Sequence, residues 1–399
     1  MAARKMWREH ELRDSYDVII IGGGVHGLAT AYYLTKLGVQ NIAVVEAKYI
    51  GFGASGRNTA IIRSNYRTAE GVAFYDLSLK LYEQLADELD FNIMFSQHGH
   101  MTLAHTERAV NGLRERANTN QFLGVNSRLI EPGEIHQIVP ELNVFGPQRY
   151  PIMAALYHPP GGIIRHDAVV WAFARGADQG GAHIHQLTEV REIELVNGSV
   201  QAVVTNRGRI KTGAVVNATA GYASTVCDMV DLMIPVETHQ LQAFVTEPLK
   251  PWLNTVVVSA TLHLYVSQTD RGEVVVGGEV EDYSSYSLRS TLQFSESAAT
   301  HLLELFPFLG NIRMLRQWAG LCDMTPDFSP IMGEVPDIRG FFLTVGWGTY
   351  GFKAGPASGH LMAQLINTGQ TPDVLKPFRL SRFYEDDLVG EKAAAAVSH

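Results

Sequence analysis

Hydrophobic and polar positions follow two different periods within the first fifty residues. Residues 17–21 and 42–45 are short β-branched runs, whereas residues 25–37 carry apolar side chains at helical spacing. Three consecutive glycines, Gly22 to Gly24, separate the first run from the helical segment. The pattern therefore predicts that the chain opens with a strand–loop–helix–strand unit.

Further along the chain, the spacing of apolar residues switches several times between the period of a strand and that of a helix. Alternation predicts antiparallel strands at residues 92–104 and 252–280, and helical spacing returns within residues 70–120 and at 166–178. Shorter strands are predicted at 182–186, 200–204 and 214–218. A glycine-rich stretch, residues 346–359, is followed by a helix that is expected to open at Gly355 and run to about Ile366.

This mixture predicts an α/β protein with α+β elements, in which two domains are interleaved along the chain. One is a Rossmann-like nucleotide-binding domain, and the other is an antiparallel-sheet domain that covers the bound ligand. The predicted nucleotide-binding domain comprises residues 17–90, 155–235 and 325–399, and the sheet domain comprises 91–154 and 236–324.

Composition narrows the class of function. The net charge of −9 argues against nucleic acid as a partner, because phosphate binding requires clustered lysine and arginine. The apolar stretch at residues 18–34 contains four glycines and a histidine and is too short for a membrane span, and residues 1–15 show no secretory signal. With two cysteines, Cys227 and Cys322, no disulfide framework is possible, so a cytoplasmic location is expected. A short alanine tail occupies 393–396.

The glycines after the first strand satisfy the dinucleotide-binding pattern. Gly22 allows the tight turn, Gly24 lets the backbone approach a pyrophosphate, and Gly27 permits close packing of helix on strand. Glu46 ends the next strand and is predicted to accept hydrogen bonds from ribose hydroxyls. The pattern alone is weak, but here it lies in the strand–turn–helix context that dinucleotide binding requires.

A second small-residue loop favours FAD over NAD. Residues 51–58 (GFGASGRN) follow Glu46, and residues 217–221 (NATAG) follow a predicted buried strand, as expected where backbone passes close to a flavin. An enzyme that binds only NAD needs neither segment. The further predicted FAD contacts are Ser55, Arg57, Asn58, Thr59, Val190, Gly221, Gly348, Gly351, Phe352 and Lys353.

Four segments together resemble the beta subunits of heterotetrameric sarcosine oxidases: DVIIIGGGVHGLATAYYL, SGRNTAIIRSNY, GGIIRHDAVVWAFARGAD and GWGTYGFKAGPASGH. The resemblance covers nearly the whole chain. It implies a glycine-oxidase-like fold, non-covalent FAD, and FMN shared with an alpha subunit and covalently attached at His166. It also implies gamma and delta subunits, and electron flow from substrate to FAD, then FMN, then oxygen.

Two cations are predicted to hold the substrate carboxylate. Arg63 follows an apolar run, and Lys353 lies between Phe352 and Ala354 in the glycine-rich stretch. Both would be costly to bury without an anionic partner. More distantly related monomeric sarcosine oxidases use an arginine and a lysine in these contexts to bind the carboxylate. Further wall residues considered are His26, Tyr66, Tyr265, Trp347 and Tyr350.

The chain departs from the monomeric enzymes in one respect that affects chemistry. Residues 272–278 contain no lysine where those enzymes use one to activate oxygen, which fits electron export to a second flavin. Cys322 occupies roughly the place where those enzymes attach FAD, although non-covalent FAD is favoured here. No metal site is expected.

Two other functions remain open from the sequence. One is an FAD-dependent dehydrogenase of proline, hydroxyproline or an opine, because subunits of such enzymes share much of the pattern. The other is a non-catalytic flavin-binding scaffold subunit.

Overall fold

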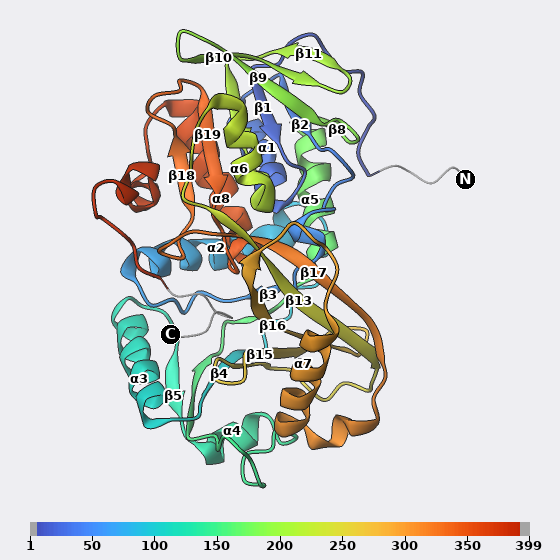
Figure 1. Ribbon diagram of the computed structural model, residues 1–399, viewed down its shortest axis with the longest axis vertical. Helices are drawn as coiled ribbons and strands as arrows, with labels where there is room; N and C mark the ends of the chain where they lie inside the picture. The colour runs from blue at the N-terminus through green and yellow to red at the C-terminus, as the bar shows by residue number, and fades with distance from the viewer. Residues whose placement is uncertain (1–5, 392–399) are drawn as a thin grey trace.

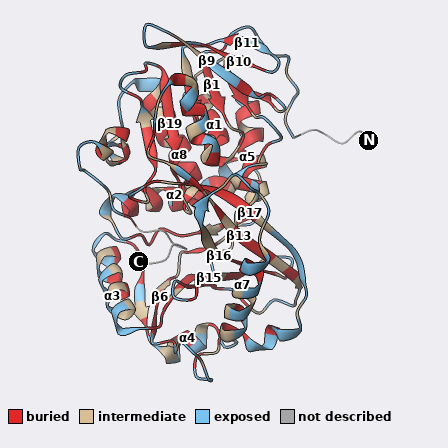
Figure 2. Cartoon of the chain, viewed as in Figure 1, coloured by how far each residue is buried: buried red, intermediate tan, exposed pale blue. Residues whose placement is uncertain are grey.

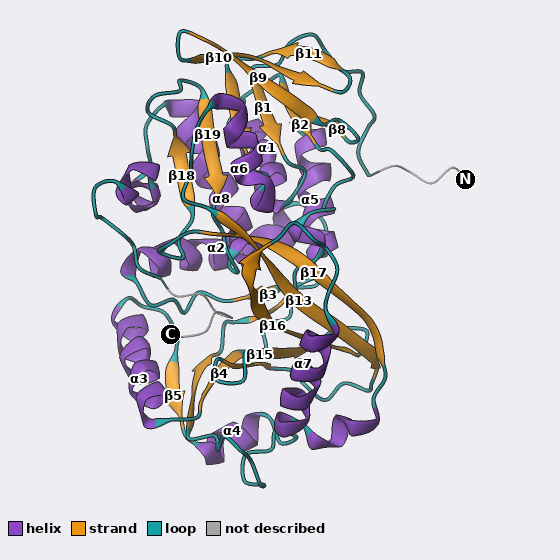
Figure 3. Cartoon of the chain, in the orientation of Figure 1, coloured by secondary structure: helices purple, strands orange, loops and turns teal. Residues whose placement is uncertain are grey.

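Two sheet-centred layers, one above the other, make up the computed structural model, which describes residues 6–391 (Figure 1). The alanine tail at 393–396 lies outside the described residues. The upper part contains a mainly parallel sheet flanked by helices, and the lower part contains a larger, strongly bent sheet. Figure 3 shows strands and helices mixed in both parts. The predicted mixed α/β fold class is confirmed.

The upper sheet has six strands and is parallel except for one edge strand. Its order is β18 (Ile331–Glu334), β19 (Phe341–Val345), β12 (Ala214–Asn217), β1 (Val18–Ile21), β2 (Ile42–Val45) and β8 (His183–His185). Along β1, Val18 and Ile20 enter one core cluster, and Ile19 and Ile21 enter another. Both faces are therefore buried, which explains the continuous apolar runs in the sequence.

Helices and a small sheet cover the two faces. On one side pack α1 (Val25–Lys36), α5 (His166–Gln179), α8 (Gly351–Thr368) and α2 (Ala69–Glu88). On the other lie α6 (Ala223–Cys227) and the sheet of β9 (Val190–Val196), β10 (Ser199–Thr205) and β11 (Gly208–Lys211). Figure 2 shows the resulting dense core in the upper part.

The lower sheet has eight strands. Its order is β17 (Met314–Met324), β13 (Glu237–Pro248), β16 (Glu273–Ser284), β15 (Leu264–Gln268), β14 (Val256–Ser259), β4 (His100–Ala104), β6 (Ala154–His158) and β5 (Arg128–Ile130). The helices of this part are α3 (Glu107–Phe122), α4 (Pro132–Ile138) and α7 (Leu292–Leu305). Between the two large sheets, β3 (Ile61–Ile62) pairs with β7 (Gly162–Ile163).

Pairing in the lower sheet differs from the antiparallel expectation at one place. β4 and β14 run parallel, because they are separated by about 150 residues and joined through other elements, not by a hairpin. β6 also pairs within this sheet, whereas the predicted nucleotide-binding segment began at residue 155. The division into two interleaved domains remains our proposal, with that boundary better placed after His158.

The last long helix begins earlier than predicted. α8 starts at Gly351, not at Gly355, so Lys353 lies in its first turn and Pro356 lies inside the helix. Proline lacks the N–H that would bond to the carbonyl four residues before it. The Tyr82 hydroxyl donates a hydrogen bond of 2.7 Å to that carbonyl, on Phe352. This contact from α2 lets the helix continue through the proline.

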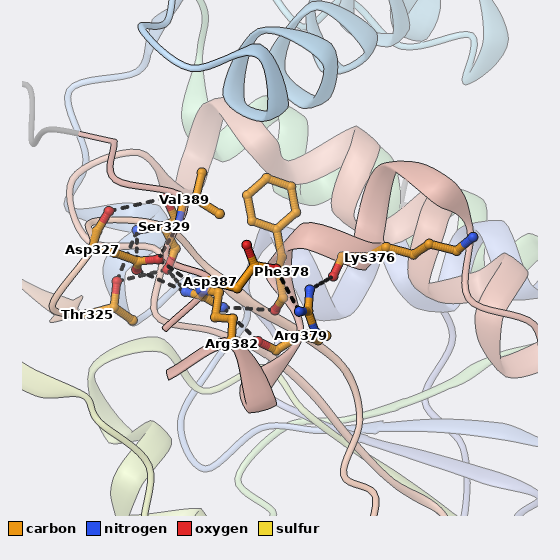
Figure 4. Close-up of polar contacts among 9 residues, drawn as sticks. All are labelled: Thr325, Asp327, Ser329, Lys376, Phe378, Arg379, Arg382, Asp387 and Val389. Atoms are coloured by element: carbon orange, nitrogen blue, oxygen red, sulfur yellow. Dashed lines mark hydrogen bonds and ion pairs between the residues drawn. The ribbon is translucent and has the colours of Figure 1, made fainter. Parts of the chain in front are cut away.

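A buried ion pair anchors the C-terminal segment, which packs against β18 (Figure 4). Arg382 donates to both carboxylate oxygens of Asp327, at 2.8 and 3.0 Å, and to the Ser329 carbonyl at 2.8 Å. Val389 N donates to the same carboxylate at 3.1 Å. The segment therefore returns toward the middle of the molecule, where Glu391 lies at the N-terminus of α2.

Candidate active site

A cavity of about 1620 Å³ runs between the two sheets. Its walls include the first strand–helix turn, the loop at residues 52–61, the start of α8 and one face of the lower sheet. Pockets for one small molecule have volumes of roughly 300–1,000 Å³, so this cavity can hold an extended ligand and a second molecule.

The upper end of the cavity has the features required for a dinucleotide. Gly22 adopts φ +115°, and a Cβ on it would overlap the Ala218 carbonyl, so the turn requires glycine. Gly24 lies on the wall as the N-cap of α1, whose first turn contains no acidic residue, so its amides can receive a phosphate. Glu46 accepts from Gly23 N at 2.9 Å and Lys48 N at 2.8 Å, which holds its carboxylate at the wall.

Two of the predicted glycines lie behind this wall. A Cβ on Gly27 would overlap the Gly22 carbonyl, so this glycine permits the helix–strand packing. A Cβ on Gly221 would meet the Leu321 side chain, so Gly221 is a packing residue against β17. Its neighbours Ala218, Thr219 and Ala220 line the cavity instead. The contact of Gly221 with the cofactor stays a prediction.

Residues of the small-residue loop line the cavity. The predicted cofactor residues that line the cavity are Gly22, Gly24, Glu46, Ser55, Arg57, Asn58, Thr59, Val190, Gly348, Gly351, Phe352 and Lys353. Ser55 Oγ accepts from Val25 N at 2.9 Å, tying the loop to α1. The Arg57 guanidinium lies 4.5 Å from the Phe52 ring centroid. His26, Tyr265, Trp347 and Tyr350 also line the cavity.

Arg63 is buried at the lower end of the cavity. Its guanidinium donates to the carbonyl and the side-chain oxygen of Asn65, both at 3.1 Å, and lies 4.3 Å from the ring of Tyr66. The Tyr66 ring therefore packs against the Arg63 guanidinium without lining the cavity itself. Within residues 6–391, no carboxylate lies within ion-pair distance of Arg63. A buried guanidinium that has no carboxylate beside it is stabilised by an anionic ligand.

Lys353 reaches the same part of the cavity from the first turn of α8. Its Nζ lies 5.5 Å from the Tyr350 ring centroid and donates to the Thr349 carbonyl at 3.4 Å. Burial, reinforced by the nearby charge of Arg63, lowers the pKa of Lys353 to about 7. An anion bound between Arg63 and Lys353 would counteract the burial and the charge repulsion that lower the pKa of Lys353.

A third cation, which the sequence did not point to, lies beside Arg63. Arg116, on α3, donates through Nε to the Asn65 carbonyl at 2.7 Å and lines the cavity. Burial, followed by the charges of Arg63 and Arg67, lowers the pKa of Arg116 to about 9. Its segment, LRERANTN, has the pattern of an ordinary exposed helix, so the position of this arginine is a tertiary effect.

Asp323 is a second residue that sequence reasoning missed. Its carboxylate accepts from Gly346 N at 2.6 Å, and its carbonyl accepts from Gly348 N at 3.0 Å. These bonds fix the loop before α8, on which Gly348 lies. Burial raises the pKa of Asp323 to about 6. Next to it, burial raises the pKa of the Cys322 thiol to about 12, so this thiol is a poor nucleophile at neutral pH.

His166 lies away from this cavity. It begins α5, half-buried, between Arg165 and Asp167, which form an ion pair at 2.8 Å. Burial lowers the pKa of His166, with Asp167 opposing the shift and Arg165 adding to it. Ile164 N donates to the Ala60 carbonyl at 3.0 Å, so the segment before this helix is joined to the residues that follow the small-residue loop.

Two classes of feature are absent from the part of the chain that the structure describes. Residues 6–391 contain no group of three or more histidine, cysteine or acidic side chains placed to hold a metal ion. Within the same range, every helix is too short or too polar to cross a membrane.

Comparison with known proteins identifies the class that this fold and site define. The sequence profile of the FAD dependent oxidoreductase family matches residues 17–365. The crystal structure of L-proline dehydrogenase from P. horikoshii superposes with a TM-score of 0.89 and 30% identity, covering 94% of this chain and 100% of that one. The chain belongs to the FAD dependent oxidoreductase family, which confirms the preference for FAD over NAD.

Within that family, the chain belongs with the sarcosine oxidase beta subunits. It is 42% identical to sarcosine oxidase subunit beta of Rhodobacter capsulatus, over 99% of this chain and 95% of that protein. It is 44% identical to the subunit of the same name from Rhizobium meliloti, over 98% and 94%. The resemblance inferred from the four sequence segments is therefore confirmed.

Proposed function

We propose that this chain oxidises the carbon–nitrogen bond of a small secondary amino acid, with sarcosine as the substrate. The observation that carries the proposal is the convergence of Arg63 and Lys353 in one cavity with the dinucleotide turn. The substrate carboxylate binds between the two cations, which orients the amine toward the small-residue loop. Bound FAD supplies the hydride acceptor, and the protein contributes positioning and electrostatics. Hydrolysis of the imine then yields glycine and formaldehyde.

The electron route forms a separate part of the proposal. Among the residues that the structure describes, the cations that line the cavity are Lys48, Arg57, Arg63, Arg67, Arg108, Arg116 and Lys353, and none of them is on β16. The lysine that promotes reaction with oxygen in monomeric enzymes therefore has no counterpart there. This supports transfer of electrons to FMN covalently held at His166, and from FMN to oxygen.

The proposed assembly includes alpha, gamma and delta subunits, as expected for the beta subunit of a heterotetramer. The alpha subunit shares the FMN and can transfer the one-carbon unit of the imine to folate. Two cysteines in the chain favour a cytoplasmic location for this assembly.

Anaerobic mixing of the FAD-loaded complex with sarcosine tests the substrate. Sarcosine should bleach the FAD absorption, and Lys353→Met should raise the sarcosine concentration required. Faster bleaching by proline or an opine would instead favour the dehydrogenase function, which the likeness to L-proline dehydrogenase supports as the second candidate. If no amino acid bleaches the flavin, the scaffold function replaces both.

Peptide mass spectrometry of the denatured, co-expressed complex tests the second flavin. FMN should remain on the peptide that contains His166 and be lost in His166→Asn. His183 is a matched control, because it is buried in the hydrogen-bonded cluster with Tyr16 and should carry no flavin. Complete release of flavin from the wild-type chain would contradict covalent attachment.

A further inference from the structure

His100, on β4, has no assigned role in the site described above. It lines the cavity, and the whole residue is 3% exposed. Neither ring nitrogen has a hydrogen-bond partner among residues 6–391, and Nδ1 is completely buried. Buried polar atoms are nearly always paired in native proteins, so an unpaired imidazole on a cavity wall points to a ligand.

The neighbouring His158 has a structural role, and its hydrogen bonds can be compared with those of His100. His158, on β6, is the direct cross-strand partner of His100 and is equally buried. Its Nδ1 bonds to the Asn126 carbonyl at 2.7 Å, and its Nε2 accepts from Ser64 N at 3.3 Å. Nε2 of His158 therefore holds the loop that carries Arg63, and its Nδ1 holds the segment before β5, whereas the nitrogens of His100 hold nothing within residues 6–391.

The charges around His100 determine what kind of group it can contact. Burial lowers its pKa well below the usual range, and the charges of Arg63, Arg116 and Lys353 act in the same direction. The ring is therefore neutral, with one N–H donor and one acceptor nitrogen. A base with so low a pKa is poorly suited to take the proton of a substrate ammonium group. An incoming carboxylate, in contrast, is attracted by the three cations and can accept the N–H.

We propose that His100 donates a hydrogen bond to the substrate carboxylate, as a third contact beside Arg63 and Lys353. The inference rests on the proposed function, because it takes the carboxylate clamp as given. The N–H of a neutral imidazole fixes the orientation of the carboxylate, which Arg63 and Lys353 attract by charge. Hydrogen bonds to a carboxylate are also stronger than those between neutral groups. His100 is thus a specificity residue for carboxylate-bearing amines.

Propionate, a carboxylate without an amine, provides the probe. Its affinity for the FAD-loaded complex can be measured from the change that it causes in the flavin absorption spectrum. His100→Leu should weaken propionate binding roughly 10- to 100-fold, the range typical of a lost hydrogen bond to a charged group. His100→Asn, which keeps an N–H donor, should recover part of that loss.

Thermal unfolding without propionate separates a ligand contact from a structural role. His100→Leu removes an unpaired polar group, so the melting temperature should stay the same or rise. His158→Leu is the matched control and should lower it, because Ser64 N and the Asn126 carbonyl lose their partner. A lower melting temperature in His100→Leu would overturn the proposal.

Three binding outcomes would also overturn it. Unchanged propionate affinity in His100→Leu would show that the imidazole does not contact the carboxylate. Weaker binding of sarcosine with unchanged binding of propionate would place the contact at the amine. If wild-type protein binds no propionate, the carboxylate clamp itself is wrong. If propionate binds through His100 but no amino acid bleaches the flavin, this inference stands and the proposed reaction fails.

Discussion

At the scale of single residues, the site brings together three cations, Arg63, Arg116 and Lys353, on a cavity wall that also carries Glu391. Burial lowers the pKa values of Arg116, Lys353 and His100, and the charge of Arg63 adds to each shift, because a nearby like charge disfavours the charged form. Each protonated side chain therefore gains from an anionic ligand. Binding of a carboxylate and protonation of Lys353 are consequently linked.

The linkage predicts a pH dependence for propionate binding. Burial lowers the pKa of Lys353 to about 7, and a bound anion raises it, so affinity should fall as pH rises above about 7. Below that pH the lysine is already charged and the affinity should level off. Spectroscopic titrations from pH 6 to 9 measure this. Lys353→Met should bind more weakly and show no such slope; a slope retained in that variant would assign the titration to another group.

At the scale of elements, contacts from neighbouring helices support the start of α8. Pro356 leaves the Phe352 carbonyl without its helical donor, and the buried Tyr82 hydroxyl replaces it at 2.7 Å. Ser78 Oγ, one turn earlier on α2, bonds to the Lys353 carbonyl at 2.7 Å. The position of Lys353 in the cavity thus depends on α2.

Tyr82→Phe should destabilise the protein by about 1–3 kcal/mol, because a buried carbonyl loses its donor. Denaturant unfolding of the FAD-free chain measures this. Tyr33→Phe is the control: Tyr33, on α1, is also buried, but its hydroxyl has no partner within the described residues, so removing it should leave stability unchanged or higher. Equal losses in the two variants would argue against a specific role for the Phe352 contact.

The C-terminal anchor makes a second prediction at this scale. Arg382 and Asp327 are fully buried, and removing one partner of such a pair typically costs about 3–5 kcal/mol. Arg382→Met should therefore lower the denaturant midpoint strongly. Arg379→Met, in the same segment, removes exposed ion pairs to Glu385 and Asp387 and should have a small effect.

The same pair makes stability depend on pH. Burial alone would raise the pKa of Asp327, but the hydrogen bonds from Arg382 outweigh burial and lower it. Its contribution is present above the pKa of the unfolded carboxyl, about 4, and is lost as pH falls further. Arg382→Met should remove this part of the acid sensitivity.

At the scale of the whole molecule, the cavity lies between the two large sheets, and both contribute residues to its wall. The strand–helix turn and the small-residue loop line its upper end, and residues of β4, β14, β15 and β17 line its lower end. A ligand that spans the cavity contacts both parts and stabilises them together.

Removal of FAD should therefore lower the melting temperature, and FAD at a hundred times its dissociation constant should stabilise the folded chain by about 2.7 kcal/mol. Differential scanning calorimetry of the two forms measures this, and the loaded form should melt in one transition. Separate transitions in the loaded form would show that the cofactor does not couple the two sheets. ADP, which can reach only the upper end, is the control ligand.

The local sequence determined the upper half of the site. A β-branched run, three glycines and an amphipathic helix specify their own geometry, because the positive φ of Gly22 and the buried strand follow from nearby residues. Arg63 and Lys353 could be singled out because each is a charge within an apolar or glycine-rich context. Only the tertiary structure brought Arg116, Asp323 and His100 to the cavity. The residues around Arg116 and His100 carry no signal of a site, and Cys322 drew attention beside Asp323 but gave Asp323 itself no role. The positions of all three depend on strand pairing and helix packing between segments far apart in the chain.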